Sequence, residues 1–300
     1  RGIASIAQRL GVPGCAGYSA SAAALLGDTS VDAPPAAVTE PMPEGLLPDD
    51  ALALVVGPTR VRTLRRAAAL VDGCMHQILP VGSDALGQLG RLQDGLPVVM
   101  AVRAIGQALG VKSVNVMRGA ARALSVYATE PRTLAMGAEL LSGAGVASGL
   151  FEAARALAHL AAGSSMLLML PSGQPLGLML AATEPDEGDC DRDLRKRVIG
   201  ALPRRVRKEL ERIRDEEELQ VRRDLAAWEA EERTRALRVA VAVARDLRMV
   251  AWSLAPQAMM AGNMEERRAR LAADERVADA LRFAGSEGCW GAWQRLYGGR

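Results

Sequence analysis

Hydrophobic residues recur every three or four positions along most of the chain, which is the period of an amphipathic helix. Glycine and proline interrupt this pattern at Gly110, Pro131 and the pair Gly143 and Gly145. The pattern predicts helices over 59–73, 83–93, 97–109, 113–127, 131–142 and 148–162. The predicted fold class is therefore mainly α, with a sparsely charged helical body over residues 51–188.

The hydrophobic period changes over residues 165–183, where two apolar runs flank the segment P-S-G-Q-P. Each run is short, and proline and glycine stand between the two as they do in a turn. A strand that is buried on both faces shows no polar alternation. We therefore predict one buried β-hairpin at 165–183 within the helical body.

The C-terminal region, 189–300, is predicted to form a long charged helix followed by a short helical tail. No proline or glycine occurs from Arg204 to Leu254, and apolar residues follow the spacing of a coiled coil over part of this stretch. Its last part is apolar over most of its circumference, so we expect a partner to cover it. The residues expected to contact a second copy are Leu225, Trp228, Leu237, Val241 and Trp252.

Charge density separates the two regions. Residues 1–188 carry 13 basic and 15 acidic side chains, whereas residues 189–300 carry 24 and 20. Sparse charge is typical of a packed core, and dense charge of both signs is typical of exposed or mutually paired helices. Ahead of the body, residues 1–27 predict an N-terminal helical segment, and residues 28–50 predict a proline-rich arm or linker.

The composition limits which ligands the side chains could bind and gives no sign of a membrane span. Of the 37 basic residues only Lys112, Lys196 and Lys208 are lysine, so nearly every cation is a planar guanidinium suited to carboxylate and phosphate. Aromatic residues make up 3% of the chain, which leaves few platforms for stacked bases. The four cysteines are far apart, and no apolar run approaches the roughly 20 residues of a membrane span. We expect a non-membrane protein of the cytoplasm, another reducing compartment or a virus-like assembly.

Residues 104–124 predict two short helices that meet at Gly110. A helix-turn-helix unit needs a tight turn, small residues where the helices touch and a polar outer face on the second helix. Over this short stretch the chain resembles the DNA-reading segment of sigma-factor-like and other bacterial helix-turn-helix proteins. Gly119 departs from that pattern because glycine weakens a helix, and two packed core helices are the alternative. The resemblance implies DNA reading by Lys112, Ser113, Asn115, Arg118 and Arg122.

The segment 191–214 is densely basic, with ten basic and four acidic residues. Such density attracts phosphate and makes binding sensitive to salt. The acidic run D-E-E-E follows at 215–218, so this helix is also suited to pairing with an antiparallel copy of itself. The residues predicted to contact nucleic acid are Arg204, Arg205, Arg207, Lys208 and Arg212.

Only two histidines, His76 and His159, are available as a catalytic base. His159 lies in an apolar helix, where a hydrogen-bonded core histidine is the usual role, and His76 lies near Cys74 without an inferable third group. No phosphate-binding loop, nucleophile elbow or dinucleotide fingerprint occurs. We predict no catalytic residue, no cofactor and no metal site, and no small-molecule substrate is indicated.

Together these patterns favour a non-enzymatic, self-assembling structural protein, such as a shell, coat or scaffold subunit, that contacts nucleic acid through its arginine-rich helix. A homo-oligomer is expected because the apolar part of the long helix needs a cover. One alternative is a transcription regulator that reads DNA through 104–124. Another is an unrecognised enzyme with His76 in its site.

Overall fold

The structure is a computed structural model, and its described residues are 59–121, 123–142, 145–184, 191–244, 247–260, 263–286, 288, 289 and 291. Helices dominate these ranges and strands form one small sheet, so the predicted mainly α class is confirmed. The predicted N-terminal segment 1–27 and the arm 28–50 lie outside the described residues. None of the described helices is long and apolar enough to cross a membrane.

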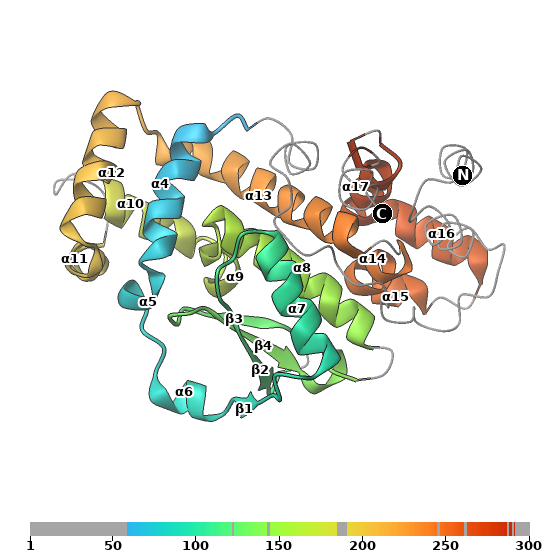
Figure 1. Cartoon of the computed structure of the whole chain (residues 1–300). Helices are drawn as coiled ribbons and strands as arrows, with labels where there is room; N and C mark the ends of the chain where they lie inside the picture. Colours follow the sequence, from blue (N-terminus) through green and yellow to red (C-terminus); the bar gives the residue numbers. More distant parts are fainter. Residues whose placement is uncertain are drawn as a thin grey trace.

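The described elements before position 189 are helices and short strands (Figure 1). They are α4 (Arg62–Gly73), α5 (Met75–Ile78), α6 (Ser83–Gly87), β1 (Gly90–Arg91), α7 (Pro97–Ala108), β2 (Asn115–Gly119), β3 (Ser125–Tyr127), β4 (Thr133–Gly137), η1 (Ala138–Leu140), α8 (Gly145–Ala162), α9 (Met166–Met169) and α10 (Gln174–Thr183). The described elements after position 189 are all helical. They are α11 (Arg192–Ala201), α12 (Arg204–Glu216), α13 (Val221–Ala244), α14 (Leu247–Leu254), α15 (Pro256–Met259), α16 (Met264–Ala273) and α17 (Glu275–Ala284).

The sheet has four strands in the order β1-β2-β4-β3. β2 and β4 run parallel, whereas β1 pairs with β2 and β3 pairs with β4 in antiparallel fashion. Val116 of β2 and Val126 of β3 both align with Leu134 of β4, and all three side chains join a core that includes residues of α7 and α8. The central strand β4 is buried throughout, so the sheet is part of the core.

The described residues pack around two hydrophobic cores. The first combines the sheet with α7, α8, the C-terminal half of α13, α14 and α17. The second combines α4, α5, α10, α11, α12 and the N-terminal part of α13. α13 therefore belongs to both cores, and in Figure 1 it crosses the molecule between them.

The β-hairpin predicted at 165–183 is wrong, because this segment forms the helices α9 and α10. Its apolar runs consist of leucine and methionine, which favour helices, and contain no β-branched residue before Thr183. Gly173 makes the turn with φ of 84°, and Pro175 occupies the first turn of α10, where a missing N–H costs no hydrogen bond. Residues 165–183 show no polar alternation because most of α10 is buried.

The helix predicted over 113–127 is also wrong, because this stretch forms β2 and β3. Val114 and Val116 are buried and alternate with exposed polar residues, which is the two-residue period of a strand. A helix-turn-helix unit is therefore not formed at 104–124. Arg122 lies outside the described residues. The other residues implied in DNA reading lie on a loop and on β2: Lys112, Ser113, Asn115 and Arg118.

Two further helix predictions fail for the same reason. The stretch 83–93 contains only the five residues of α6 before β1 begins, and the stretch 131–142 contains β4 followed by a single 3-10 turn. These strands have two to five residues, so a helical period and a strand period are hard to distinguish over their length.

The unbroken helix predicted from Arg204 to Leu254 is wrong. α12 ends at Glu216, Glu218 adopts a left-handed φ of 50°, and α13 begins only at Val221. The break falls within the acidic run 215–218, and carboxylates near a helix C-terminus oppose the negative end of the helix dipole. The charged region is therefore several helices that fold back on the body.

The apolar part of this region is covered by its own chain. Trp228 is fully buried in the second core, and Leu237 and Val241 are buried in the first, against α8 and α17. Leu225 is likewise buried, and Trp252 is half-buried against the first core. The reason for expecting a partner on these residues is thus removed, and self-association stays a prediction with no surface assigned to it.

Candidate nucleic-acid interface

Two basic helices, α11 and α12, lie at one end of the molecule, beside α4 and α10 (Figure 1). Their apolar residues point inward: Val198 and Leu202 at the end of α11, and Leu210 and Ile213 of α12, are buried. The side chain of Asp191 accepts hydrogen bonds from the first backbone N–H groups of α11, which fixes where that helix begins. This packing leaves the charged faces of both helices toward solvent.

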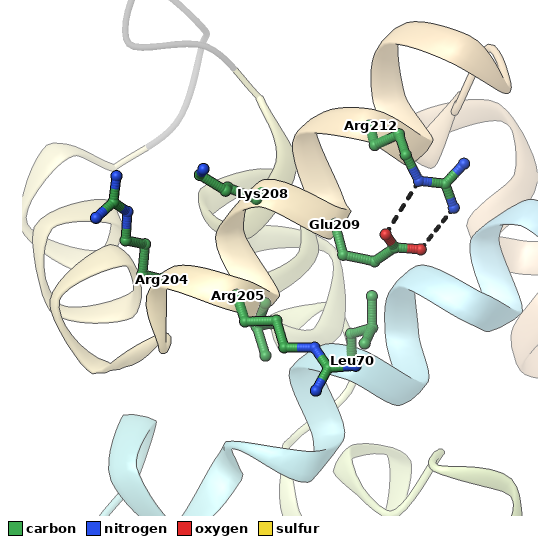
Figure 2. A pocket seen from close by; sticks show the side chains of 7 residues that line it. Leu70, Arg204, Arg205, Lys208, Glu209 and Arg212 are labelled. Carbon is green, nitrogen blue, oxygen red and sulfur yellow. Dashed lines mark hydrogen bonds and ion pairs between the residues drawn. The ribbon is translucent and has the colours of Figure 1, made fainter.

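The first hollow on this surface lies between α4 and α12 and encloses about 960 Å³. Figure 2 shows its lining, in which four basic side chains of α12 stand against one carboxylate. The lining residues are Leu70, Arg204, Arg205, Val206, Lys208, Glu209 and Arg212. This lining includes four of the five residues predicted from the sequence to contact nucleic acid, and Arg207 is the exception. The four residues differ in whether their side chains form ion pairs within the protein.

Three of these cations are free to meet a ligand. Arg204, Arg205 and Lys208 are exposed and form no ion pair with any residue that the structure describes. In Figure 2 Arg204 and Lys208 lie on the side away from the one carboxylate in view, and the side chain of Arg205 extends toward Leu70. An unpaired cation has no protein contact to give up when it binds an anion, so these three side chains are the strongest candidates for phosphate contact.

Arg212 is different because its guanidinium is already bound. Its Nε lies 3.0 Å from Oε2 of Glu209, and its Nη2 lies 2.6 Å from Oε1 of Glu209 (Figure 2). Its Nη1 lies 3.0 Å from Oε2 of Glu216. The hydrogen bonds from Arg212 hold the pKa of the Glu209 carboxyl below its usual value. Arg212 therefore lines the hollow without being free in it.

A second hollow, of about 590 Å³, lies between α11 and α12. Arg207 faces this hollow and not the first, so α12 has a basic hollow on each side. Arg192 and Lys196 are exposed here and, within the described part of the chain, have no ion-pair partner. Neither was singled out from the sequence, although both belong to the basic segment 191–214. The remaining lining residues are Arg195, Ile199 and Gly200.

Most of the polar groups that line the two hollows are therefore guanidinium and ammonium donors. Neither hollow is lined by an aromatic residue or by a histidine or cysteine. Over the whole described part of the chain, no group of three metal-ligating side chains comes together. Such a surface can bind phosphate or carboxylate groups, and its two hollows have no aromatic side chain on which bases could stack.

The residues implied in DNA reading are not part of this surface. Arg118 and Asn115 are exposed on β2 and line neither basic hollow. Lys112 and Ser113 line a separate hollow of about 580 Å³, together with Arg132 of the loop before β4. The structure thus separates the two sets of candidate nucleic-acid residues.

His76 has two polar neighbours, one of them a carboxylate. Its Nε2 lies 3.3 Å from Oε2 of Glu130, whose side chain is 75% exposed, and 3.2 Å from Nε2 of Gln77. Burial raises the pKa of the adjacent Cys74 thiol, which disfavours the thiolate that a nucleophile requires. Neither His76 nor Cys74 borders the hollow that Glu130 lines.

His159 is a buried core residue, as its apolar helix predicts. Its Nδ1 lies 2.9 Å from Oγ of Ser164, which in turn donates a 3.2 Å hydrogen bond to Glu232. Arg65 and Arg235 also bind Glu232, so the network joins α4, α8 and α13. His159, Ser164 and Glu232 are at most 1% exposed, so this serine–histidine–carboxylate set has no access for a substrate.

No family model, curated protein or solved structure matches this chain. Evidence for function therefore comes from the geometry of the described residues alone. Among the described hollows, the two beside α12 are lined mostly by basic side chains, five of which are exposed and have no ion-pair partner among the described residues.

Proposed function

We propose that the protein binds the phosphate backbone of double-stranded nucleic acid through the surface formed by α11 and α12. The observation that carries the proposal is the set of five exposed cations that line the two hollows and have no ion-pair partner among the described residues. They are Arg192, Lys196, Arg204, Arg205 and Lys208. We name this set the free-cation surface.

Several features support phosphate as the target. Side chains on α11 and α12 are held by buried apolar contacts, so the charges are presented from rigid helices. Arginine and lysine that neutralise phosphates release condensed counterions, and this release drives binding without reading sequence. Like charges placed close together on a surface repel one another, and a polyanion relieves that repulsion.

A duplex suits this surface better than a single strand does. Proteins that hold single strands without sequence preference combine positive grooves with aromatic side chains on which bases stack. The two hollows provide the positive charge without the aromatic residues. A duplex presents its phosphates outward and keeps its bases stacked internally, so charge alone is sufficient for contact.

The test is a salt titration of binding, followed by fluorescence anisotropy of a labelled duplex of about 20 base pairs, or roughly two helical turns. With three to five phosphate contacts, the logarithm of the association constant should fall with the logarithm of salt at a slope of about −2.7 to −4.5. Replacing Arg204, Arg205 and Lys208 with glutamine should weaken binding at least about tenfold at low salt and flatten the slope by about 2 to 3.

A matched control removes the same charge elsewhere. Arg91, Arg118 and Arg268 are exposed and have no ion-pair partner among the described residues. The variant with these three arginines changed to glutamine should keep most of the wild-type affinity and slope. Equal losses in the two triple variants, or binding that does not respond to salt, would show that the free-cation surface is not the binding site.

A further inference from the structure

Two arginines at the edge of the first hollow are held by carboxylates of the same chain. Arg66 of α4 places Nη2 3.1 Å from Oε1 of Glu209 and Nη1 2.5 Å from Oε1 of Glu217. Arg212 binds both oxygens of Glu209, and Glu216 as well. Glu209 is therefore shared by two guanidinium groups that come from different helices.

We infer that Glu209 occupies the place of a phosphate group, and that Arg66 and Arg212 are further phosphate ligands which Glu209 withholds until a duplex displaces it. The inference rests on the proposed function and deepens it. A carboxylate and a phosphate present two oxygens to the fork of a guanidinium group in the same way, so one can replace the other. Glu209 thus sets how far the free-cation surface extends toward α4.

The ion pairs that Arg66 and Arg212 form with Glu209 are exposed enough for a phosphate group to replace the carboxylate. The side chains of Arg66 and Arg212 are 43% and 41% exposed, and that of Glu209 is 35% exposed. Ion pairs between side chains in contact with water contribute little to stability, because water and salt screen them. A duplex phosphate can therefore compete for these guanidinium groups, whereas it cannot reach the buried pairs of Glu232.

The experiment compares two substitutions that remove the same charge from α12. Glu209→Gln weakens the hold on Arg66 and Arg212. Glu211→Gln is the matched control, because Glu211 is exposed and has no hydrogen bond or ion pair with a described residue. Duplex affinity and its salt dependence are measured by anisotropy for both variants and for the wild-type chain.

We expect Glu209→Gln to raise duplex affinity about tenfold at low salt and to steepen the salt slope by about 0.9 to 1.8, which corresponds to one or two added phosphate contacts. Glu211→Gln should leave the slope unchanged. In the Glu209→Gln background, replacing both Arg66 and Arg212 with glutamine should return the slope to its wild-type value. Glu217→Gln removes a carboxylate that lies 2.5 Å from Arg66 and 3.8 Å from Arg212 and leaves Glu209 in place. This variant should give about half the change, and it serves if Glu209→Gln lowers the melting temperature.

The outcomes separate the inference from the function on which it rests. If the wild-type chain binds with a salt slope, and Glu209→Gln and Glu217→Gln match Glu211→Gln, the role of Glu209 is overturned and the proposed function stands. If neither the wild-type chain nor the variants bind the duplex, both are overturned. Binding by Glu209→Gln without binding by the wild-type chain would overturn the proposed function and support the role of Glu209 in withholding Arg66 and Arg212.

Discussion

Two buried ionisable side chains, Asp72 and His159, respond to pH in opposite directions. Burial raises the pKa of Asp72 to about 6, although hydrogen bonds from Ser165 and the Met166 amide oppose that rise. Burial also lowers the pKa of His159 to about 3. The stability that Asp72 contributes is fully present below pH 3.8 and is lost as pH rises through 6. That of His159 is present above pH 6.5 and is lost as pH falls toward 3.

The substitution Asp72→Asn tests the first of these effects. The wild-type chain should lose about 2 kcal/mol of Asp72-linked stability as pH rises from about 4.5 to 7, and the variant should not. Urea unfolding of both proteins at the two pH values measures this, and the contribution of His159 cancels in the difference. Asp84→Asn, at an exposed carboxyl, is the control. A difference between wild type and Asp72→Asn that is the same at both pH values would contradict the effect.

At the scale of the elements, sequence periodicity located the long helices well and the sheet poorly. The helices predicted over 59–73, 97–109 and 148–162 correspond to α4, α7 and α8. These helices have 12 to 18 residues, so the 3.6-residue period repeats often enough to be read. β2 and β4 have five residues each, and the buried T-L-A-M-G of β4 shows no alternation at all. Only the long-range pairing of these strands identifies them.

The sequence predicted the positive charge of the candidate site but not the ion pairs that hold some of its arginines. The sequence placed Arg204, Arg205 and Lys208 on one helix, and α12 carries all three with exposed side chains. It could not show that Arg212 is bound by Glu209, since both residues look equally free on a helix surface. Arg66 joins the same carboxylate from 143 positions away in the sequence. Contacts over that separation depend on tertiary packing, which a local pattern does not encode.

The junction between α8 and α4 depends on a single glycine. Gly163 follows α8 with φ of 65°, and a Cβ placed there would lie 2.6 Å from the Cβ of Ala69. Gly163→Ala should therefore destabilise the protein by about 2 to 4 kcal/mol, through backbone strain and the clash with α4. Gly200→Ala in α11 is the matched control, because nothing lies within 4 Å of the added methyl group.

Thermal and urea unfolding of the two glycine variants would measure this effect. Gly200→Ala should be neutral or stabilising by up to about 1 kcal/mol, since alanine favours a helix. If Gly163→Ala were as stable as Gly200→Ala, α8 and α4 would not be in the close contact described here.

Over the whole molecule, the charged C-terminal region serves the fold as well as the candidate interface. α13 joins the two cores and buries its apolar residues against the chain's own helices. α11 and α12 lie at one end of that arrangement (Figure 1). Their free cations are exposed to solvent. The large hydrophobic side chains exposed among the described residues are only Met100, Leu168 and Met260. Charge, and not exposed apolar area, therefore distinguishes the described surface.

The chain provides its own probe of that surface, because its only lysines are Lys112, Lys196 and Lys208. All three are exposed, two on the free-cation surface and one on the loop before β2. We propose acetylating the protein with and without duplex and measuring the modification of each lysine by mass spectrometry. If α11 and α12 hold the phosphate backbone, duplex should lower the reactivity of Lys196 and Lys208 several-fold and leave Lys112 unchanged. Unchanged reactivity at all three lysines, or protection of Lys112 alone, would contradict that binding mode.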